Sequence, residues 1–422
     1  MTAPPTVAPV PKAPGPGDEP TSRHPATPAQ LAWLETQLRA WRSEGLVDDG
    51  AAAAIRARYV AHRRVTLARI VLTLGALFVG LGLIWLVASN LDQLSPWMRF
   101  GLVTLVWLGL VAAAEALAYR RERSGDVASP VVGAVRLLAA GAFGAVVFQA
   151  AQSLQVPAYE PLLVGIWAAG ALLYAYAVAA IGPAVLGIGL GAYWVVWQTV
   201  EGSEDVLTVT LAVASTALLA VAVGALHHRL TGRAAAWRDL GVPWREIGAV
   251  LALGALFFAA LPFDDEVAGG TPLMWTVVGV AVVLAVGAML TGDRLDRLEV
   301  GLGVVVVGLV AVLALWRTTS GIADTADLST ADWARAVVSV AVYLAAASGY
   351  AVLGAMRDSG RLTWIATAAL VVFTTTQAFA VFAPILSGAV LFLAVGLVLL
   401  ATGVLADRGR RRLIREGQEA RS

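Results

Sequence analysis

Two ionisable side chains lie inside apolar stretches where an unpaired charge would be costly. Glu115 lies near the end of the apolar stretch 98–119, and Arg136 lies near the start of the next stretch, 131–152. If both stretches are membrane-spanning helices joined by a short loop, the carboxylate and the guanidinium reach a similar depth. The sequence therefore predicts a structural Glu115–Arg136 ion pair, because ionisable groups inside a membrane usually have partners. The alternative is that Arg136 extends to lipid phosphates and Glu115 contacts water.

A second set of polar side chains could line a cavity. Gln149, Gln152 and Gln198 are expected near helix ends on the side where the turn with Asn90 and Asp92 lies. Amides in membrane helices usually form hydrogen bonds between helices, worth about 0.6–2 kcal/mol each. That interpretation is favoured. The functional alternative is a polar cavity that opens outward, lined by the three glutamines, with Asn90 and Asp92 at its mouth.

The residues needed for most catalytic or metal chemistry are missing from the apolar stretches. The chain has no cysteine, and its four histidines, His24, His62, His227 and His228, all lie outside these stretches. Thiolate chemistry is therefore excluded, and no cluster has the spacing of metal ligands or of an acid–base pair. We predict no catalytic residues, no metal, no cofactor and no enzyme activity. A net charge of +1 gives no support for a nucleic-acid partner.

The composition predicts a membrane protein. Hydrophobic residues make up 59% of the 422 residues and charged residues only 14%, against about 45–50% and about 25% in soluble domains. The apolar residues fall in blocks of about 18–24, the length that crosses ~30 Å of hydrocarbon as a helix. The fold class expected is an all-α polytopic transmembrane bundle. Its twelve predicted helices are 67–89, 98–119, 131–152, 161–181, 183–200, 205–226, 246–263, 272–291, 299–316, 334–355, 362–382 and 385–405.

The charges between the blocks predict the orientation. Arginine and lysine favour the cytoplasmic ends of membrane helices. With the N-terminus inside, nearly all arginines of the alternate loops fall in the cytoplasm, and both termini are cytoplasmic. Only Ile181-Gly182-Pro183 separates the fourth and fifth helices; if they formed one span, every later loop would change sides. Tryptophans near the expected outer helix ends agree with this orientation: Trp85, Trp97, Trp194, Trp197, Trp275, Trp316 and Trp333.

Four segments follow from these patterns. Residues 1–26 are rich in proline and are expected to be disordered. Residues 27–64 are expected to form a cytoplasmic helical hairpin. Residues 65–406 form the transmembrane bundle of about 12 helices, and residues 407–422 form a basic cytoplasmic tail.

The predicted hairpin has clear start and stop signals. Thr27 is expected to cap the first helix, Gly45 to end it, and Asp48 or Asp49 to cap the second. The apolar stripe either packs only on itself, which is favoured, or forms a docking face for a protein partner. The stripe residues are Leu31, Leu34, Leu38 and Trp41 in the first helix and Ala51, Ala54, Ile55 and Tyr59 in the second.

Several short motifs resemble a known family. The turn ASNLDQLSPWMRF, the hairpin LETQLRAWRSEGLVDDGAAAAIRARY (34–59) and Ala151-Gln152 with a later Leu-Trp-Ala run resemble the bacterial membrane-protein family named domain of unknown function 2157. Leu91 stands where that family's turn would have tryptophan. The resemblance covers roughly residues 31–200. It implies a multi-spanning inner-membrane protein, and it implies no activity, because the family has none established.

The expected function is therefore stated by class. We expect an inner-membrane protein that acts as a non-enzymatic scaffold, sensor or envelope component. Its expected partners are membrane lipids, and a protein that binds the hairpin is the less favoured alternative to a stripe that packs only on itself. The alternative is a secondary transporter of a neutral or lipid-like substrate, in which the long loop 227–245 would separate two halves of six helices each. Most transporters carry charged residues or broken helices near the membrane midplane, and the predicted helices have no charge there.

Overall fold

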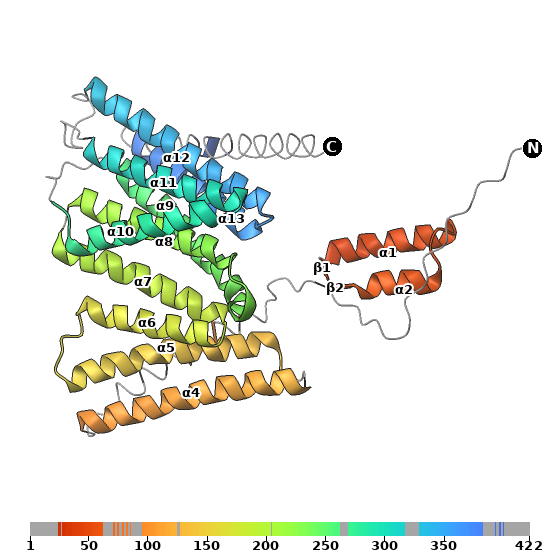
Figure 1. Cartoon of the computed structure of the whole chain (residues 1–422). Coiled ribbons are helices and arrows are strands. Elements are labelled where there is room, and N and C mark those ends of the chain that lie inside the picture. Colours follow the sequence, from red (N-terminus) through yellow and green to blue (C-terminus); the bar gives the residue numbers. More distant parts are fainter. Residues whose placement is uncertain are drawn as a thin grey trace, which may run out of the picture. The chain divides into compact units, whose positions relative to one another are not determined.

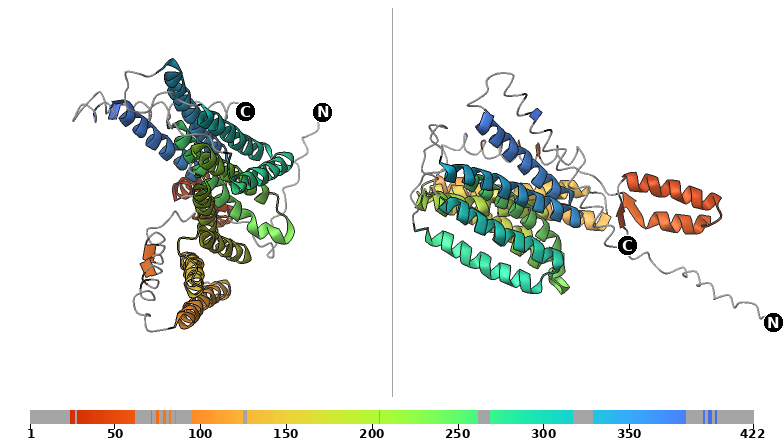
Figure 2. Two further views of the ribbon diagram at one scale, coloured as in Figure 1. Left: turned by 90° about the vertical axis from the view of Figure 1, so that its left-hand side faces the viewer. Right: turned by 90° about the horizontal axis from the view of Figure 1, so that it is seen from above.

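The computed structural model describes two compact units, residues Met1–Gly75 and Ala76–Ser422. The residues described are 24–26, 28–61, 95–124, 127–203, 205–261, 269–316 and 329–382, together with the isolated positions 71, 74, 75, 78, 79, 82, 85, 393, 396, 397 and 400. Figure 1 shows the described elements with their labels, and Figure 2 gives two further views.

The first unit contains a helical hairpin closed by a short strand pair. Helices α1 (Pro28–Ser43) and α2 (Asp49–Ala57) lie side by side, and strands β1 (His24–Ala26) and β2 (Tyr59–Ala61) pair in parallel. The hairpin was predicted from the sequence, but the strand pair was not. The expectation that all of residues 1–26 are disordered is therefore wrong for the last three of them.

The ends of these helices follow ordinary capping chemistry. Gly45 has a φ of +73°, which is the left-handed conformation that commonly ends a helix. Glycine adopts it with little strain because it has no Cβ atom. The side chain of Asp48 accepts a hydrogen bond from the backbone N–H of Ala51 and caps α2. Both signals were predicted, with Asp48 rather than Asp49 as the cap. Thr27, the predicted cap of α1, lies outside the described residues.

The hairpin packs its apolar stripe against itself. Leu34 and Leu38 from α1 meet Ala52 from α2, and all three are buried. The sequence predicted Ala51 and Ala54 for this position, but both are exposed. A run of four alanines gives no contrast between faces, so the pattern there could not fix which alanine points inward.

The second unit is an all-α bundle, as predicted. Its described part contains ten α-helices and one 3₁₀ helix: α4 (Pro96–Ser124), α5 (Ser129–Ser153), α6 (Pro161–Ala177), α7 (Ile181–Gly202), α8 (Val206–His227), η1 (Gly232–Leu240), α9 (Gly241–Ala260), α10 (Pro272–Thr291), α11 (Arg294–Leu315), α12 (Thr330–Met356) and α13 (Gly360–Phe382). Within the described residues, eight helical segments are long and apolar enough to cross a membrane, by length and composition. The predicted polytopic bundle is confirmed.

Ten of the twelve predicted spans correspond to the ten α-helices of the described part. The other two, 67–89 and 385–405, lie mostly outside the described residues and stay predictions. The predicted fourth and fifth spans are α6 and α7, and they form two separate helices. Gly165 lies against Trp194 while Gly187 lies against Leu172, so the two helices run antiparallel. The turn between them is residues 178–180; Ile181, Gly182 and Pro183, predicted as the break, lie in the first turn of α7, where proline is tolerated.

Five connections lie at one end of the bundle, which we call the arginine-rich end. They join α4 to α5, α6 to α7, α8 to α9, α10 to α11, and α12 to α13. Arginines stand in or next to four of these five connections: Arg120, Arg121, Arg123, Arg229, Arg233, Arg238, Arg294, Arg297, Arg357 and Arg361.

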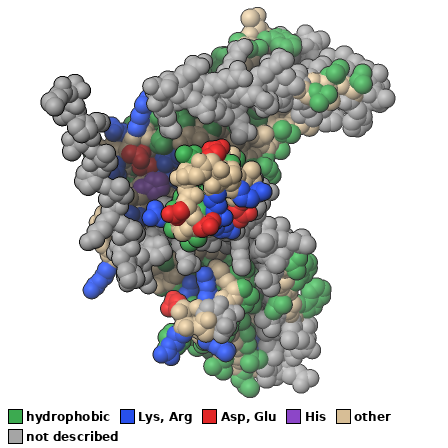
Figure 3. All heavy atoms as spheres, turned by 90° about the vertical axis from the view of Figure 1, so that its right-hand side faces the viewer, with side chains coloured by type: hydrophobic (Ala, Val, Ile, Leu, Met, Phe, Trp, Pro, Cys, Tyr) green, Lys and Arg blue, Asp and Glu red, His purple; other side chains and the backbone are tan. Residues whose placement is uncertain are grey.

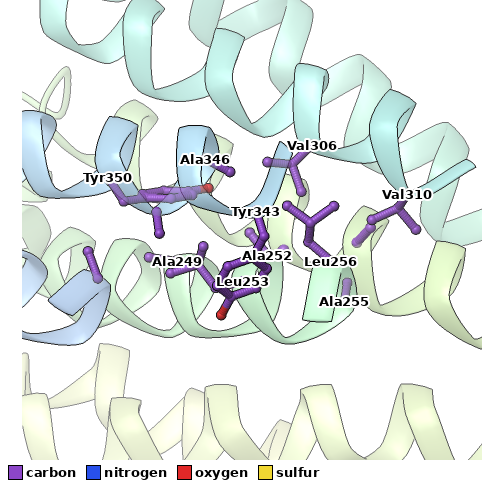
Figure 4. Close-up of a cluster of buried hydrophobic side chains, with 14 of the residues drawn as sticks. Ala249, Ala252, Leu253, Ala255, Leu256, Val306, Val310, Tyr343, Ala346 and Tyr350 are labelled. Carbon is purple, nitrogen blue, oxygen red and sulfur yellow. The ribbon is translucent and has the colours of Figure 1, made fainter. Parts of the chain in front are cut away.

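The middle of the bundle is built around a tight α8–α9 pair. A Cβ atom at Gly224 would lie 2.9 Å from the carbonyl oxygen of Gly241, so only glycine permits this approach of the two backbones. Around this pair, α11, α12 and α13 supply a buried apolar cluster. Figure 4 shows part of it, with Tyr343 and Leu253 among the labelled side chains. Tyr343 stacks on Phe373 with ring centroids 3.8 Å apart.

Candidate functional site

Polar side chains at the arginine-rich end form a series of contacts that crosses the bundle. We call this series the polar belt and divide it into three links. The first link is Glu115, Arg136 and Tyr174; the second is Tyr176, His227 and Trp244; the third is His228, Arg245, Asp296, Glu299 and Arg357. Neighbouring links are connected through the chain itself, because Tyr174 and Tyr176 share α6 and the two histidines are adjacent. Figure 3 shows acidic, basic and histidine side chains close together on one face.

The first link joins α4, α5 and α6. Arg136 donates to both carboxylate oxygens of Glu115, with Nε–Oε1 at 3.0 Å and Nη2–Oε2 at 2.6 Å. The hydroxyl of Tyr174 donates to Oε1 of the same carboxylate at 2.8 Å. Two parallel hydrogen bonds between a guanidinium and a carboxylate form the stronger, geometrically specific kind of ion pair. The structure thus brings together the two ionisable residues that the sequence paired.

The second link joins α6 to α8 and α9. The hydroxyl of Tyr176 lies 2.9 Å from Nε2 of His227, and the indole N–H of Trp244 donates to that hydroxyl at 2.9 Å. Nδ1 of His227 lies 2.7 Å from the backbone carbonyl of Val223, one turn earlier in α8. The indole of Trp237 in η1 adds a hydrogen bond to the backbone carbonyl of Tyr176. The connection between α8 and α9, which contains η1, is thus held against α6.

The third link is a buried group of charges from four helices. Arg245 of α9 and Arg357, the residue that follows α12, both donate to Oδ1 of Asp296, at 2.7 and 2.8 Å. Arg357 also lies 2.8 Å from Oε2 of Glu299, one turn further along α11. His228, at the end of α8, contacts the guanidinium of Arg245 at 2.9 Å. Two guanidiniums therefore face two carboxylates, so the formal charges balance, as a buried charged group requires.

The start of α11 places the carboxylates of this link. Asp293 caps the helix, and its side chain accepts from the backbone N–H of Asp296, which reaches back to the N–H of Asp293. This capping box fixes Asp296 in the first turn, and the spacing of three residues puts Glu299 on the same face. Asp296 and Glu299 are both fully buried.

The third link also contains polar atoms whose hydrogen bonds are incomplete. Among the described residues, neither carboxylate oxygen of Glu299 has a well-aligned donor, although Arg357 is at ion-pair distance. The Nε atoms of Arg245 and Arg357 also lack acceptors in the described part. Buried polar groups of this kind are costly to leave unpaired, so they usually bind a water or serve a function.

The second predicted site, the polar cavity, is only partly within the described residues. Gln149 and Gln152 lie on α5 and Gln198 lies on α7; Gln152 is exposed. The structure describes no hydrogen bond between these three side chains. Asn90 and Asp92, the predicted mouth, lie outside the described residues, so the cavity stays a prediction.

The second and third links were not predicted from the sequence. The predicted spans began at residues 246 and 299, where the uninterrupted apolar runs begin, so Arg245 and Asp296 were assigned to loops. In the structure α9 begins at Gly241 and α11 at Arg294, which brings both residues inside helices. The available signal was the pattern Asp293-x-x-Asp296, a capping box just before an apolar run.

Comparison with known proteins identifies one family. Residues 39–182 match the model of a family described as predicted membrane protein (DUF2157). This confirms the predicted family resemblance over that segment. No curated protein and no solved structure gives a significant match. The matched segment includes the whole first link and Tyr176, whereas the charged residues of the third link lie beyond it.

Proposed function

We propose that the protein is a non-enzymatic scaffold or sensor of the bacterial inner membrane. The observation that supports this most is the distribution of charge in the described bundle. Charged side chains collect near the helix ends, in the polar belt and around Arg335 at the opposite end, where Arg335 donates to the backbone carbonyls of Ala259 and Leu261. Between these ends the buried side chains of the described part are uncharged, and most of them are apolar or aromatic. In such a bundle the polar belt connects the helices at one end. The described helices have no charged side chain at mid-depth, where secondary transporters usually bind their solute.

The proposed orientation has both termini in the cytoplasm. Four of the five connections at the arginine-rich end carry arginine in or next to them, and positive residues near helix ends face the cytoplasm in most membrane proteins. The polar belt then lies at the cytoplasmic surface, in reach of soluble partners.

The proposed partners are membrane lipids and a protein that binds the hairpin. The apolar stripe of the hairpin packs between α1 and α2. Outside it, Trp33 on α1 and Leu46 in the turn are 60% and 69% exposed. Tryptophan is enriched in protein–protein interfaces, so the exposed Trp33 is the residue that supports this partner. Photocrosslinking in cells from position 33 should capture one protein, and the same probe at the exposed Arg58 should capture none.

The alternative function is a secondary transporter of a neutral or lipid-like substrate. Three buried hydroxyls in the described interior, those of Ser215, Tyr350 and Thr374, have no hydrogen-bond partner and could bind an uncharged polar group. The tight α8–α9 contact argues against movement of two six-helix halves, because the two halves would meet at that pair. The close approach of Gly224 and Gly241 leaves little room for sliding.

A solute panel separates the two functions. We would measure the melting temperature of the purified protein with neutral metabolites and with lipids, and then measure uptake of any stabilising solute by proteoliposomes. The scaffold or sensor proposal expects stabilisation by lipids only and no uptake. A solute that stabilises the protein, accumulates in vesicles and loses both effects in Ser215→Ala would establish the transporter and reject the proposal.

A further inference from the structure

The hydrogen bonds around His227 fix the position of its ring proton. The carbonyl of Val223 can only accept, and it lies 2.7 Å from Nδ1, so Nδ1 carries the hydrogen in a neutral ring. Nε2 is then an acceptor, and the hydroxyl of Tyr176, 2.9 Å away, donates to it. The indole of Trp244 can only donate, and it donates to the oxygen of Tyr176. Donation therefore has one direction: Trp244 donates to Tyr176, and Tyr176 donates to His227.

Protonation of His227 reverses the last of these bonds. Nε2 would then carry a hydrogen and donate to the Tyr176 oxygen, which already accepts from Trp244. The hydroxyl hydrogen of Tyr176 would lose its acceptor, and no other acceptor for it is present among the described contacts. The hydrogen bond that joins α6 to α8 is thus matched to the neutral form of the ring.

The charges around His227 also disfavour a proton. The residue is buried, with 6% of its surface exposed. The groups that face it are Tyr176 from α6, the adjacent His228 from its own chain segment, and Arg245 from α9, which is positive. From η1 comes Trp237, whose ring packs edge-on against Tyr176. No carboxylate in the described part forms an ion pair with His227, and the nearby Asp296 and Glu299 are engaged by arginines.

We propose that His227 is a proton-binding site that makes the polar belt sensitive to pH. An imidazole ordinarily changes charge between about pH 5 and 8. Burial beside the positive Arg245 keeps the His227 ring neutral over most of that range, so its change of charge belongs to the acidic end. Uptake of a proton by His227 leaves the hydroxyl hydrogen of Tyr176 without an acceptor and places a second positive charge beside Arg245, and both effects loosen α6 from α8 and α9. This inference rests on the proposed sensor function and names its stimulus, acidification at the arginine-rich end. A change in a single buried charge next to a packed interface is a usual way to switch between two arrangements of helices.

The first test measures the protonation state of the His227 ring directly. The variant His24→Gln, His62→Gln, His228→Gln keeps His227 as the only histidine, and ¹⁵N-labelled imidazole reports the state of both ring nitrogens. At pH 8 we expect the neutral ring with hydrogen on Nδ1, and at pH 5 the charged ring. Hydrogen on Nε2 at pH 8, or a ring that is still neutral at pH 5, would overturn the proposal.

The second test measures the movement of α6 relative to α8. Because the chain has no cysteine, spin labels can be attached at two exposed positions, Ala177→Cys at the end of α6 and Arg229→Cys after α8. We expect the distance between the labels to lengthen or broaden by about 1–2 Å on going from pH 8 to pH 5, the usual size of a helix shift. The shift should be lost in His227→Gln and kept in the control His228→Gln. A shift that persists in His227→Gln contradicts the proposal.

A further variant, Tyr176→Phe, tests the proposal independently if His227→Gln does not fold. Tyr176→Phe removes the hydroxyl that the proposal requires, so the labels should show the longer or broader distribution already at pH 8, with no further change at pH 5. A Tyr176→Phe variant that responds to pH as the parent does would overturn the mechanism. The two proposals fail separately: solute uptake rejects the sensor, whereas a pH-insensitive His227 rejects only this inference.

Discussion

Arg245 and Asp296 form a buried ion pair between α9 and α11, with Nη2 of the arginine 2.7 Å from Oδ1 of the aspartate. The side chains are only 8% and 1% exposed. The same carboxylate oxygen accepts from Arg357, which directly follows α12, so one acidic residue connects α11 to α9 and to the end of α12. Asp296 is therefore the residue of the third link on which most contacts depend.

Loss of the Asp296 carboxylate should destabilise the bundle strongly. In Asp296→Ala two arginines would lose a shared partner in a buried setting, which costs about 3–5 kcal/mol when one member of a buried pair is removed. We expect a much lower unfolding midpoint in a denaturing-detergent titration. The control Asp293→Ala removes only the exposed cap of the same helix, a loss of about 1 kcal/mol. Equal losses in the two variants would show that the ion pairs contribute little.

The Glu115–Arg136 pair should show a smaller, measurable coupling. The side chains are 38% and 18% exposed, so water weakens the attraction, while the two parallel hydrogen bonds strengthen it. We expect a coupling energy of about 1 kcal/mol from the double-mutant cycle of Glu115→Gln and Arg136→Gln. Unfolding free energies of the four proteins give this quantity. Strictly additive losses would mean that the contact is not energetically coupled.

The contrast between these two pairs shows what the sequence could predict. Glu115 and Arg136 lie on consecutive helices joined by a short loop, so hydropathy and chain direction alone place them at one depth. Arg357 and Asp296 lie on neighbouring helices too, but 61 residues apart and near helix ends that were assigned to loops. Their contact depends on how α11 and α12 rotate and pack, and periodicity did not fix that rotation.

A similar limit applies to the hairpin and the fold. For the ten spans that the structure describes, the order and the type of the helices followed from the lengths of the apolar stretches, because those lengths are read directly from the chain. The strand pair of β1 and β2 has only three residues in each strand. A strand that short has no recognisable alternation, so its pairing is decided by the closure of the hairpin and not by local pattern.

The turn between α6 and α7 should gain stability from one glycine. Ala179 has a φ of +48°, a conformation that costs a residue with a Cβ about 1–2 kcal/mol. Ala179→Gly removes that cost and should raise the melting temperature. The control Ala169→Gly lies at an exposed position inside α6, where glycine should lower stability by about 1 kcal/mol. A loss of stability in both variants would contradict the left-handed turn that separates these helices.

The orientation of the bundle can be tested with single cysteines, since the chain has none of its own. Ser124 ends α4 at the arginine-rich end, and Ser203 follows α7 at the opposite end. If arginines near helix ends hold that end in the cytoplasm, a membrane-impermeant maleimide added to intact cells should label Ser203→Cys and leave Ser124→Cys unlabelled. Inverted membrane vesicles should give the reverse pattern. Labelling of Ser124→Cys from outside would invert the topology and place the polar belt, with His227, on the periplasmic face. Labelling of both sites from the same side would mean that an even number of crossings separates them, which contradicts three separate helices α5, α6 and α7 between those positions.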